Sequence, residues 1–96
     1  MAHTINLKGR IMDLPFDVRK DVCILLNQHL NNDYRKLAHH MGYNVQDIKT
    51  FEQQTEDPTD AILNDWGPKK GSTIGKLIEY LEIMDRSDVI DVLYGR

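Results

Sequence analysis

The chain has 96 residues, of which 41% are hydrophobic, and its formal net charge is −3. This length fits a single domain built around one core, and the composition is typical of a folded globule. No apolar run reaches the eighteen or so residues of a transmembrane helix, so we expect no direct membrane insertion. The net negative charge disfavours binding of nucleic acid over the whole surface.

Cysteine usage and the first residues bear on the cellular compartment. Cys23 is the only cysteine, which excludes an internal disulfide and a zinc site built from thiolates. A reducing, cytoplasmic setting is the simplest interpretation. Residues 1–10 lack the apolar central region of a signal peptide. We expect residues 1–13 to form an N-terminal arm and residues 14–96 to form the domain.

Short apolar stripes separated by Pro, Gly, Asn and Asp predict a series of helices. The first is expected from Leu14 to about His29, with Pro15 in its first turn, where the missing N–H is not needed. Its apolar stripe consists of Val18, Val22, Leu25 and Leu26. The second is expected over residues 33–41, with a capping Asn or Asp at its start and Gly42 after its end. Its stripe consists of Tyr34, Leu37, Ala38 and Met41.

The third and fourth predicted helices have clear start signals. Asn44 is a good N-cap for the third helix, whose apolar positions are Val45, Ile48 and Phe51. Asp57 can cap the fourth, and Pro58 suits its first turn. The fourth stripe consists of Ile62, Leu63 and Trp66, and the following Gly-Pro pair stops the helix.

The last two predicted helices complete the fold. The fifth begins at Ser72 or Thr73, and its stripe consists of Ile74, Leu77, Ile78 and Leu81. Gly75 costs about 1 kcal/mol relative to Ala inside a helix, and we attribute it to the close approach of a neighbouring helix. The sixth is expected to use Ser87 as its cap and to pack through Val89, Ile90, Val92 and Leu93. Because no stretch alternates like a half-buried strand, the pattern predicts an all-α fold, a six-helix antiparallel bundle.

The chain from Leu14 to about Leu93 resembles the death domain, a six-helix bundle, and three stretches carry the resemblance. Residues 14–23, LPFDVRKDVC, are similar to the first helix of death domains in netrin receptors. Residues 33–38, DYRKLA, are similar to the W-x-x-L-A opening of the family's second helix. Tyr34 replaces the Trp, and an aromatic ring with a polar tip can fill the same core site. Residues 57–66 and 72–77, with DPT, DW and STIGKL, are similar to the Toll/interleukin-1-receptor pathway branch of adaptors and associated kinases.

The resemblance implies a function without an active site. Death domains bind other death domains, of the same or another protein, through charged surfaces. It therefore implies no catalytic, cofactor-binding or metal-binding residues, no cofactor and no nucleic-acid partner. The family's contacts are heterologous, so they propagate into stacks instead of closing as a two-fold dimer. The expected function is a non-catalytic homotypic interaction module that assembles cytoplasmic signalling complexes of the innate-immune or NF-κB type.

Charge is distributed unevenly along the predicted helices. Basic residues lie on the first two helices and in the loop after the fourth, and acidic residues gather in the third helix, at the start of the fourth and near the start of the sixth. Such complementary faces select partners more than they add affinity. The candidate protein-interaction residues are Arg19, Lys20, Arg35, Lys36, Glu52, Asp57, Asp60, Trp66, Lys69, Lys70, Asp85 and Asp88.

Two pairs of these charges give the sharpest hypothesis. In the family, the fourth helix and its following loop contact the junction of the fifth and sixth helices of a neighbour. The resemblance therefore implies that the loop with Lys69 and Lys70 of one copy meets Asp85 and Asp88 of the next. The alternative is that these are solvated loop and cap charges, because an acidic residue suits a first helical turn without any partner. Trp66 is interpreted first as a core or half-buried anchor, and second as an interface residue.

The histidines and the cysteine do not form a recognisable site. His39 and His40 are adjacent, so on a helix they point in different directions, and no H-E-x-x-H motif occurs. Cys23 is expected to be a small buried side chain.

Two alternatives stay open at this stage. One is the cytoplasmic death domain of a netrin- or neurotrophin-type receptor, which would form shorter assemblies. The other is a small helical DNA-binding domain. A recognition helix carries several Arg, Lys, Asn or Gln side chains on one face. The third segment offers Lys49 and several Gln, but Asp47 and Glu52 interrupt them, which argues against DNA.

Overall fold

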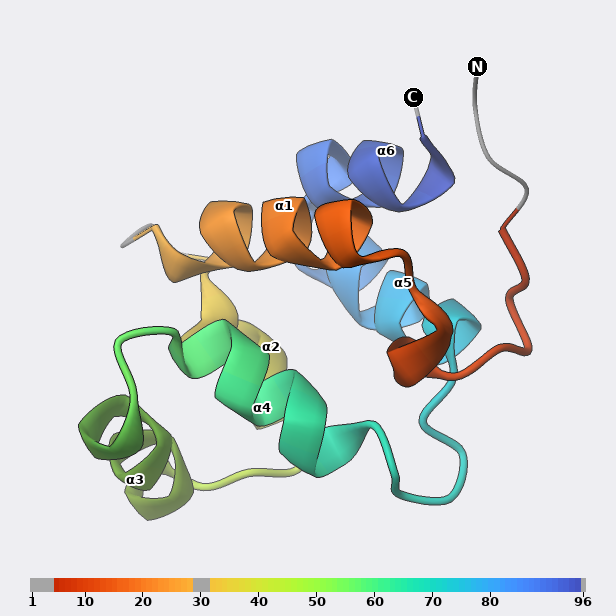
Figure 1. Ribbon diagram of the computed structural model, residues 1–96. Coiled ribbons are helices and arrows are strands. Elements are labelled where there is room, and N and C mark those ends of the chain that lie inside the picture. The colour runs from red at the N-terminus through yellow and green to blue at the C-terminus, as the bar shows by residue number, and fades with distance from the viewer. Residues whose placement is uncertain (1–4, 29–31, 96) are drawn as a thin grey trace.

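The computed structural model describes residues 5–28 and 32–95 of the chain. In these ranges the chain forms no strand, one 3-10 helix, η1 (Ile11–Asp13), and six α-helices that pack into a bundle (Figure 1). The helices are α1 (Phe16–Asn27), α2 (Tyr34–His40), α3 (Val45–Gln54), α4 (Pro58–Trp66), α5 (Ile74–Ile83) and α6 (Ser87–Tyr94). The predicted all-α six-helix bundle is confirmed. None of the helices in the described ranges is long and apolar enough to cross a membrane.

Side-chain caps fix the starts of four helices, as the sequence predicts. Oxygens of Asp33, Asn44, Asp57 and Thr73 accept hydrogen bonds from backbone N–H groups in the first turns of α2, α3, α4 and α5. Such caps satisfy donors that have no partner within the helix. Gly42 follows α2 with a φ of +99°, a conformation that glycine adopts without steric cost.

Three details of the predicted elements are wrong. α1 begins at Phe16, because Pro15 is its extended N-cap and does not enter the first turn. The predicted end of that helix near His29 lies outside the described residues. Ser87 is the first residue of α6, and Arg86 occupies the N-cap position without a capping side-chain bond. Val45, in the first turn of α3, is 70% exposed and does not pack in the core.

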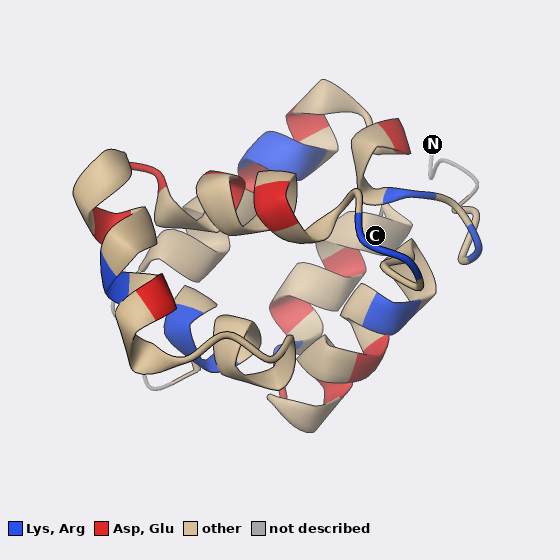
Figure 2. Cartoon of the chain, turned by 90° about the horizontal axis from the view of Figure 1, so that it is seen from below, with Lys and Arg blue, Asp and Glu red and all other residues tan. Residues whose placement is uncertain are grey.

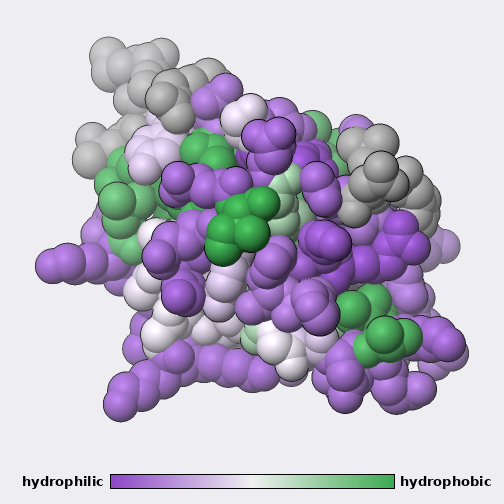
Figure 3. All heavy atoms as spheres, turned by 180° about the vertical axis from the view of Figure 1, so that it is seen from behind, coloured by the Kyte–Doolittle hydropathy of each residue, from purple (hydrophilic) through white to green (hydrophobic). Residues whose placement is uncertain are grey.

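The predicted stripes meet in one core. α1 packs against α4 and α6, α5 packs against α6 and α2, and α3 packs against α4 and α2. Cys23 is buried, as expected, and fully buried Ile11 in η1 joins the same core. Burial of one such aliphatic side chain contributes about 1.5–3 kcal/mol. On the face drawn in Figure 3, the exposed apolar side chains form separate patches among hydrophilic residues.

Gly75 has a different neighbour from the one the sequence suggested. A Cβ at this position would lie 2.9 Å from the carbonyl oxygen of Leu7, and the Gly75 N–H donates to that same oxygen at 2.8 Å. The close approach is therefore made by the N-terminal segment, not by a neighbouring helix. This contact could not be predicted locally, because it joins residues that lie 68 positions apart in the chain.

Candidate functional site: charged interaction surfaces

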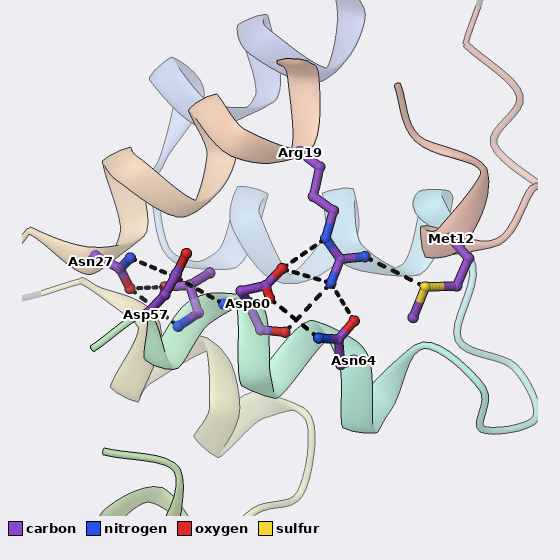
Figure 4. Close-up of polar contacts among 7 residues, drawn as sticks. Met12, Arg19, Asn27, Asp57, Asp60 and Asn64 are labelled. Carbon is purple, nitrogen blue, oxygen red and sulfur yellow. Dashed lines mark hydrogen bonds and ion pairs between the residues drawn. The ribbon is translucent and has the colours of Figure 1, made fainter. Parts of the chain in front are cut away.

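Arg19 and Asp60, two predicted interaction residues of opposite charge, contact each other within the chain (Figure 4). The Arg19 guanidinium donates from Nε to Asp60 Oδ1 at 3.0 Å and from Nη2 to Asn64 Oδ1 at 2.7 Å. Its Nη1 lies 3.5 Å from the sulfur of Met12. The side chain of Arg19 is only 14% exposed, whereas that of Asp60 is 43% exposed. Arg19 thus ties α1 to α4, and the carboxylate of Asp60 is the more exposed side of this pair.

The side chain of Asp57 also forms hydrogen bonds within the chain. Its Oδ1 accepts hydrogen bonds from the Asp60 N–H at 3.1 Å and from the side-chain amide of Asn27 at 2.7 Å. The Asn27 oxygen in turn accepts from the backbone N–H and the hydroxyl of Thr59. This network joins the end of α1 to the start of α4, as Figure 4 shows, so the structure gives Asp57 a structural role.

Among the basic residues of the first two helices, some form ion pairs within the chain and others do not. The Arg35 guanidinium donates to both oxygens of the buried Asp33, and these bonds raise the pKa of Arg35. Its side chain is still half exposed. Lys20 and Lys36 are exposed and form no ion pair with any residue that the structure describes. Lys20 lies on α1 and Lys36 on α2, whereas Lys69 and Lys70 lie in the loop after α4, so the four lysines come from three separate segments.

Glu52 accepts a hydrogen bond from the hydroxyl of Tyr34. Tyr34 is buried; burial, and then its bond to Glu52, raise its pKa to about 12. Tyr34 therefore fills the core site with its ring and satisfies its hydroxyl at the surface, which is the arrangement expected for an aromatic residue with a polar tip.

The loop after α4 carries two exposed lysines, of which Lys69 is paired within the chain. The ammonium of Lys69 lies 3.5 Å from Asp65 and 4.6 Å from the centroid of the Tyr43 ring. Lys70 is exposed and makes no ion pair within the described ranges. Trp66, at the end of α4, is 5% exposed and packs near the Tyr80 ring, so its side chain belongs to the core.

The start of α6 is organised by a residue that the sequence analysis did not single out. Arg86 is 6% exposed, and it donates to the carbonyl oxygens of Asn32 at 2.7 Å and Leu25 at 3.3 Å. It also donates to both oxygens of Asp88, which lowers the pKa of that carboxyl. A single Arg between two helices belongs to no apolar stripe, so the sequence pattern does not mark it. The one local signal was its position directly before the predicted cap of the sixth helix, Ser87. Asp88 remains half exposed despite this pairing.

Asp85 forms the turn between α5 and α6. It is exposed and has a φ of +57°, a left-handed conformation that Asp and Asn adopt more readily than most residues. Together with the exposed Glu82 and Asp88, it makes up what we call the acidic end, and Lys69 and Lys70 make up the basic end.

The basic and acidic ends lie at opposite ends of one helix. The basic end precedes α5, and the acidic end begins with Glu82 in the last turn of α5 and continues after it. Ten helical residues span about 15 Å. The structure therefore does not bring the two sets of charges together within one molecule, and it leaves each able to face a second molecule.

Two features of the described residues concern metal binding and thiol reactivity. No group of three or more His, Cys, Asp or Glu side chains in this part of the chain could hold a metal ion. Burial, with help from the nearby carboxylates of Asp57 and Asp60, raises the pKa of the Cys23 thiol to about 12. A thiol of this kind stays protonated and is a poor nucleophile at neutral pH.

Comparison with known proteins supports an interaction role. The family model described as "Death domain" matches residues 19–96. Tumor necrosis factor receptor superfamily member 16 from Gallus gallus is 32% identical over 82 residues, which cover 85% of this chain. The chain spans about a fifth of the length of that relative.

Proposed function

This chain belongs to the death-domain family, and from that premise we propose that it associates head to tail with further copies of itself through the two ends of α5. The family makes it a protein–protein interaction module. In the proposed contact, the basic end of one copy faces the acidic end of the next. Because the two surfaces differ, an assembly of any length still has one free basic end and one free acidic end, so further copies can add.

One observation carries this proposal: the fold holds some of the candidate charges internally and leaves charges of opposite sign exposed at the two ends of α5, whereas the exposed Lys20 and Lys36 on α1 and α2 are of one sign. Arg19 is bound to Asp60, and Arg35 is bound to Asp33. Lys70 is exposed before α5, whereas Glu82 and Asp85 are exposed where the helix ends. Charges that no internal contact holds are the ones that can steer a partner.

Light scattering over a concentration series tests the proposal. Wild type should form larger species as its concentration rises, and Lys70→Glu should shift this association to higher concentration. Lys49→Glu is the matched control, because Lys49 is exposed on α3 and its reversal changes the net charge equally. A wild type that stays monomeric at all concentrations, or equal behaviour of the two variants, would refute head-to-tail association through these ends.

For the signalling context we propose an innate-immune or NF-κB-type complex in the cytoplasm, with other death domains as further partners. The resemblance of residues 57–66 and 72–77 to the Toll/interleukin-1-receptor pathway branch supports this proposal. The second candidate is the cytoplasmic death domain of a netrin- or neurotrophin-type receptor. The relative named as a tumor necrosis factor receptor superfamily member supports a receptor as the parent protein. Assemblies of many copies would favour the first context, and assemblies limited to dimers would favour the second.

A further inference from the structure

The N-terminal segment is held against the start of α5 by backbone contacts. Arg10 and Thr73 form an antiparallel bridge. The N–H of Ile74 donates to the Gly9 carbonyl at 3.0 Å, and the N–H of Gly75 donates to the Leu7 carbonyl at 2.8 Å. Because these contacts act on the backbone, they fix the positions of the residues between them, including Lys8.

This placement brings two further cations to the basic end. Lys8 and Arg10 line a groove of about 360 Å³ together with Lys69, Lys70 and the rest of the loop over residues 67–73. Figure 2 shows the Lys and Arg stretches of the N-terminal coil and of this loop near one another. All four cations are exposed; Lys69 is paired with Asp65, whereas Lys8, Arg10 and Lys70 make no ion pair within the described ranges. The groove therefore presents four exposed cations from two separate segments, and three of them have no ion pair there.

The chemistry of the groove favours carboxylates on a protein surface over a single phosphate group. Phosphate sites at helix starts depend on free backbone N–H donors. At the start of α5 these donors are occupied, since Ile74 and Gly75 donate to the N-terminal segment and the Lys76 N–H donates to the Thr73 hydroxyl. What remains is a row of side-chain cations, which suits several carboxylates spread along a partner.

We infer that the N-terminal segment completes the basic end, and that Lys8 and Arg10 help to bind the acidic end of a second copy of this chain. The inference rests on the proposed head-to-tail association and extends it to residues outside the six-helix bundle. The occupant follows from charge complementarity, because Glu82 in the last turn of α5 and Asp85 just after it offer exposed carboxylates at the far end of the helix. Asp88, half exposed beside Arg86, adds a third.

Sedimentation velocity of the full chain tests this inference, with Lys8→Glu compared against Lys49→Glu. Both substitutions reverse one exposed lysine. We expect Lys8→Glu to weaken self-association about fivefold, the effect of replacing one exposed attraction by a repulsion, and Lys49→Glu to leave it unchanged. The difference should shrink in 0.5 M salt, where exposed charges are screened. Thermal unfolding verifies that both variants are folded.

The outcomes separate this inference from the proposed function. If Lys70→Glu weakens association but Lys8→Glu behaves like Lys49→Glu, the N-terminal segment takes no part and the inference is wrong, while head-to-tail association stands. If the wild type does not associate at all, both are wrong. A weakening by Lys8→Glu that is equal at low and high salt would also overturn the inference, because the effect would not be electrostatic.

Discussion

Replacement of Arg19 by Met tests whether this residue belongs to the fold or to a partner surface. The substitution keeps most of the side-chain length and removes the hydrogen bonds to Asp60 and Asn64. A hydrogen bond to a charged group contributes about 1.5–3 kcal/mol. The carboxylate of Asp60 is 43% exposed, so water replaces part of the loss, and we expect a destabilisation of about 1.5 kcal/mol.

Urea unfolding measures this loss. With a slope m of about 1.5 kcal/mol/M for a domain of this size, the midpoint should fall by about 1 M at an unchanged slope. The matched control is Lys20→Met on the next, exposed position, which should change stability by less than about 0.5 kcal/mol. Micromolar protein in 0.5 M salt keeps self-association out of the measurement. If Arg19→Met is as stable as Lys20→Met, the contacts of Arg19 do not stabilise the fold, and Arg19 must be counted among the charges available to a partner.

Three further predictions concern residues with well-defined contacts. Arg86→Met should cost about 3 kcal/mol in urea unfolding, because two carbonyls and Asp88 lose a buried donor, whereas Asp88→Asn should cost about 0.5 kcal/mol. The folded pKa of Asp88 is below its ordinary value of 3.8. The ionised carboxylate therefore stabilises the fold fully above pH 3.8, and this stabilisation is lost as the pH falls through the folded pKa. Melting temperatures of wild type and Asp88→Asn should converge in acid, and a constant difference would contradict this. Gly75→Ala should lower the melting temperature despite the higher helix propensity of Ala, because the new Cβ meets the Leu7 carbonyl, and a higher melting temperature would show that the N-terminal segment yields easily. Cys23, whose pKa is raised to about 12, should react with a thiol reagent at pH 8 only as fast as the chain unfolds; reaction at the rate of a free thiol would show an open site.

Local chemistry made most of the helices predictable from the sequence. Asp57 followed by Pro58 combines a capping oxygen with a residue suited to the first turn, and α4 begins there. The alternation of apolar stripes with Gly and Pro also indicates the core, since Leu37, Leu63 and Leu77 are fully buried. These signals act within one or two helical turns, which is why a single sequence contains them.

The parts that the sequence did not reveal depend on contacts between distant segments. The partner of Gly75 is Leu7, and Arg86 binds the carbonyl of Leu25 at the end of α1. The internal pairing of Arg19 with Asp60 is of the same kind. A list of charges taken from the sequence therefore mixes residues that hold the bundle together with residues that are exposed to a partner, and only the packed structure separates them.

Complementation between two defective variants tests head-to-tail association most directly. Lys70→Glu retains the acidic end, and Glu82→Gln/Asp85→Asn retains the basic end without creating a reversed ion pair with Glu at position 70; Asn at position 85 tolerates the φ of +57°. Sedimentation velocity is measured for each variant alone and for an equimolar mixture, at a concentration at which the wild type associates. We predict that each variant alone is monomeric and that the mixture forms a 1:1 complex through its one intact pair of surfaces. A mixture that stays monomeric, or a single variant that associates like the wild type, would contradict the proposed contact.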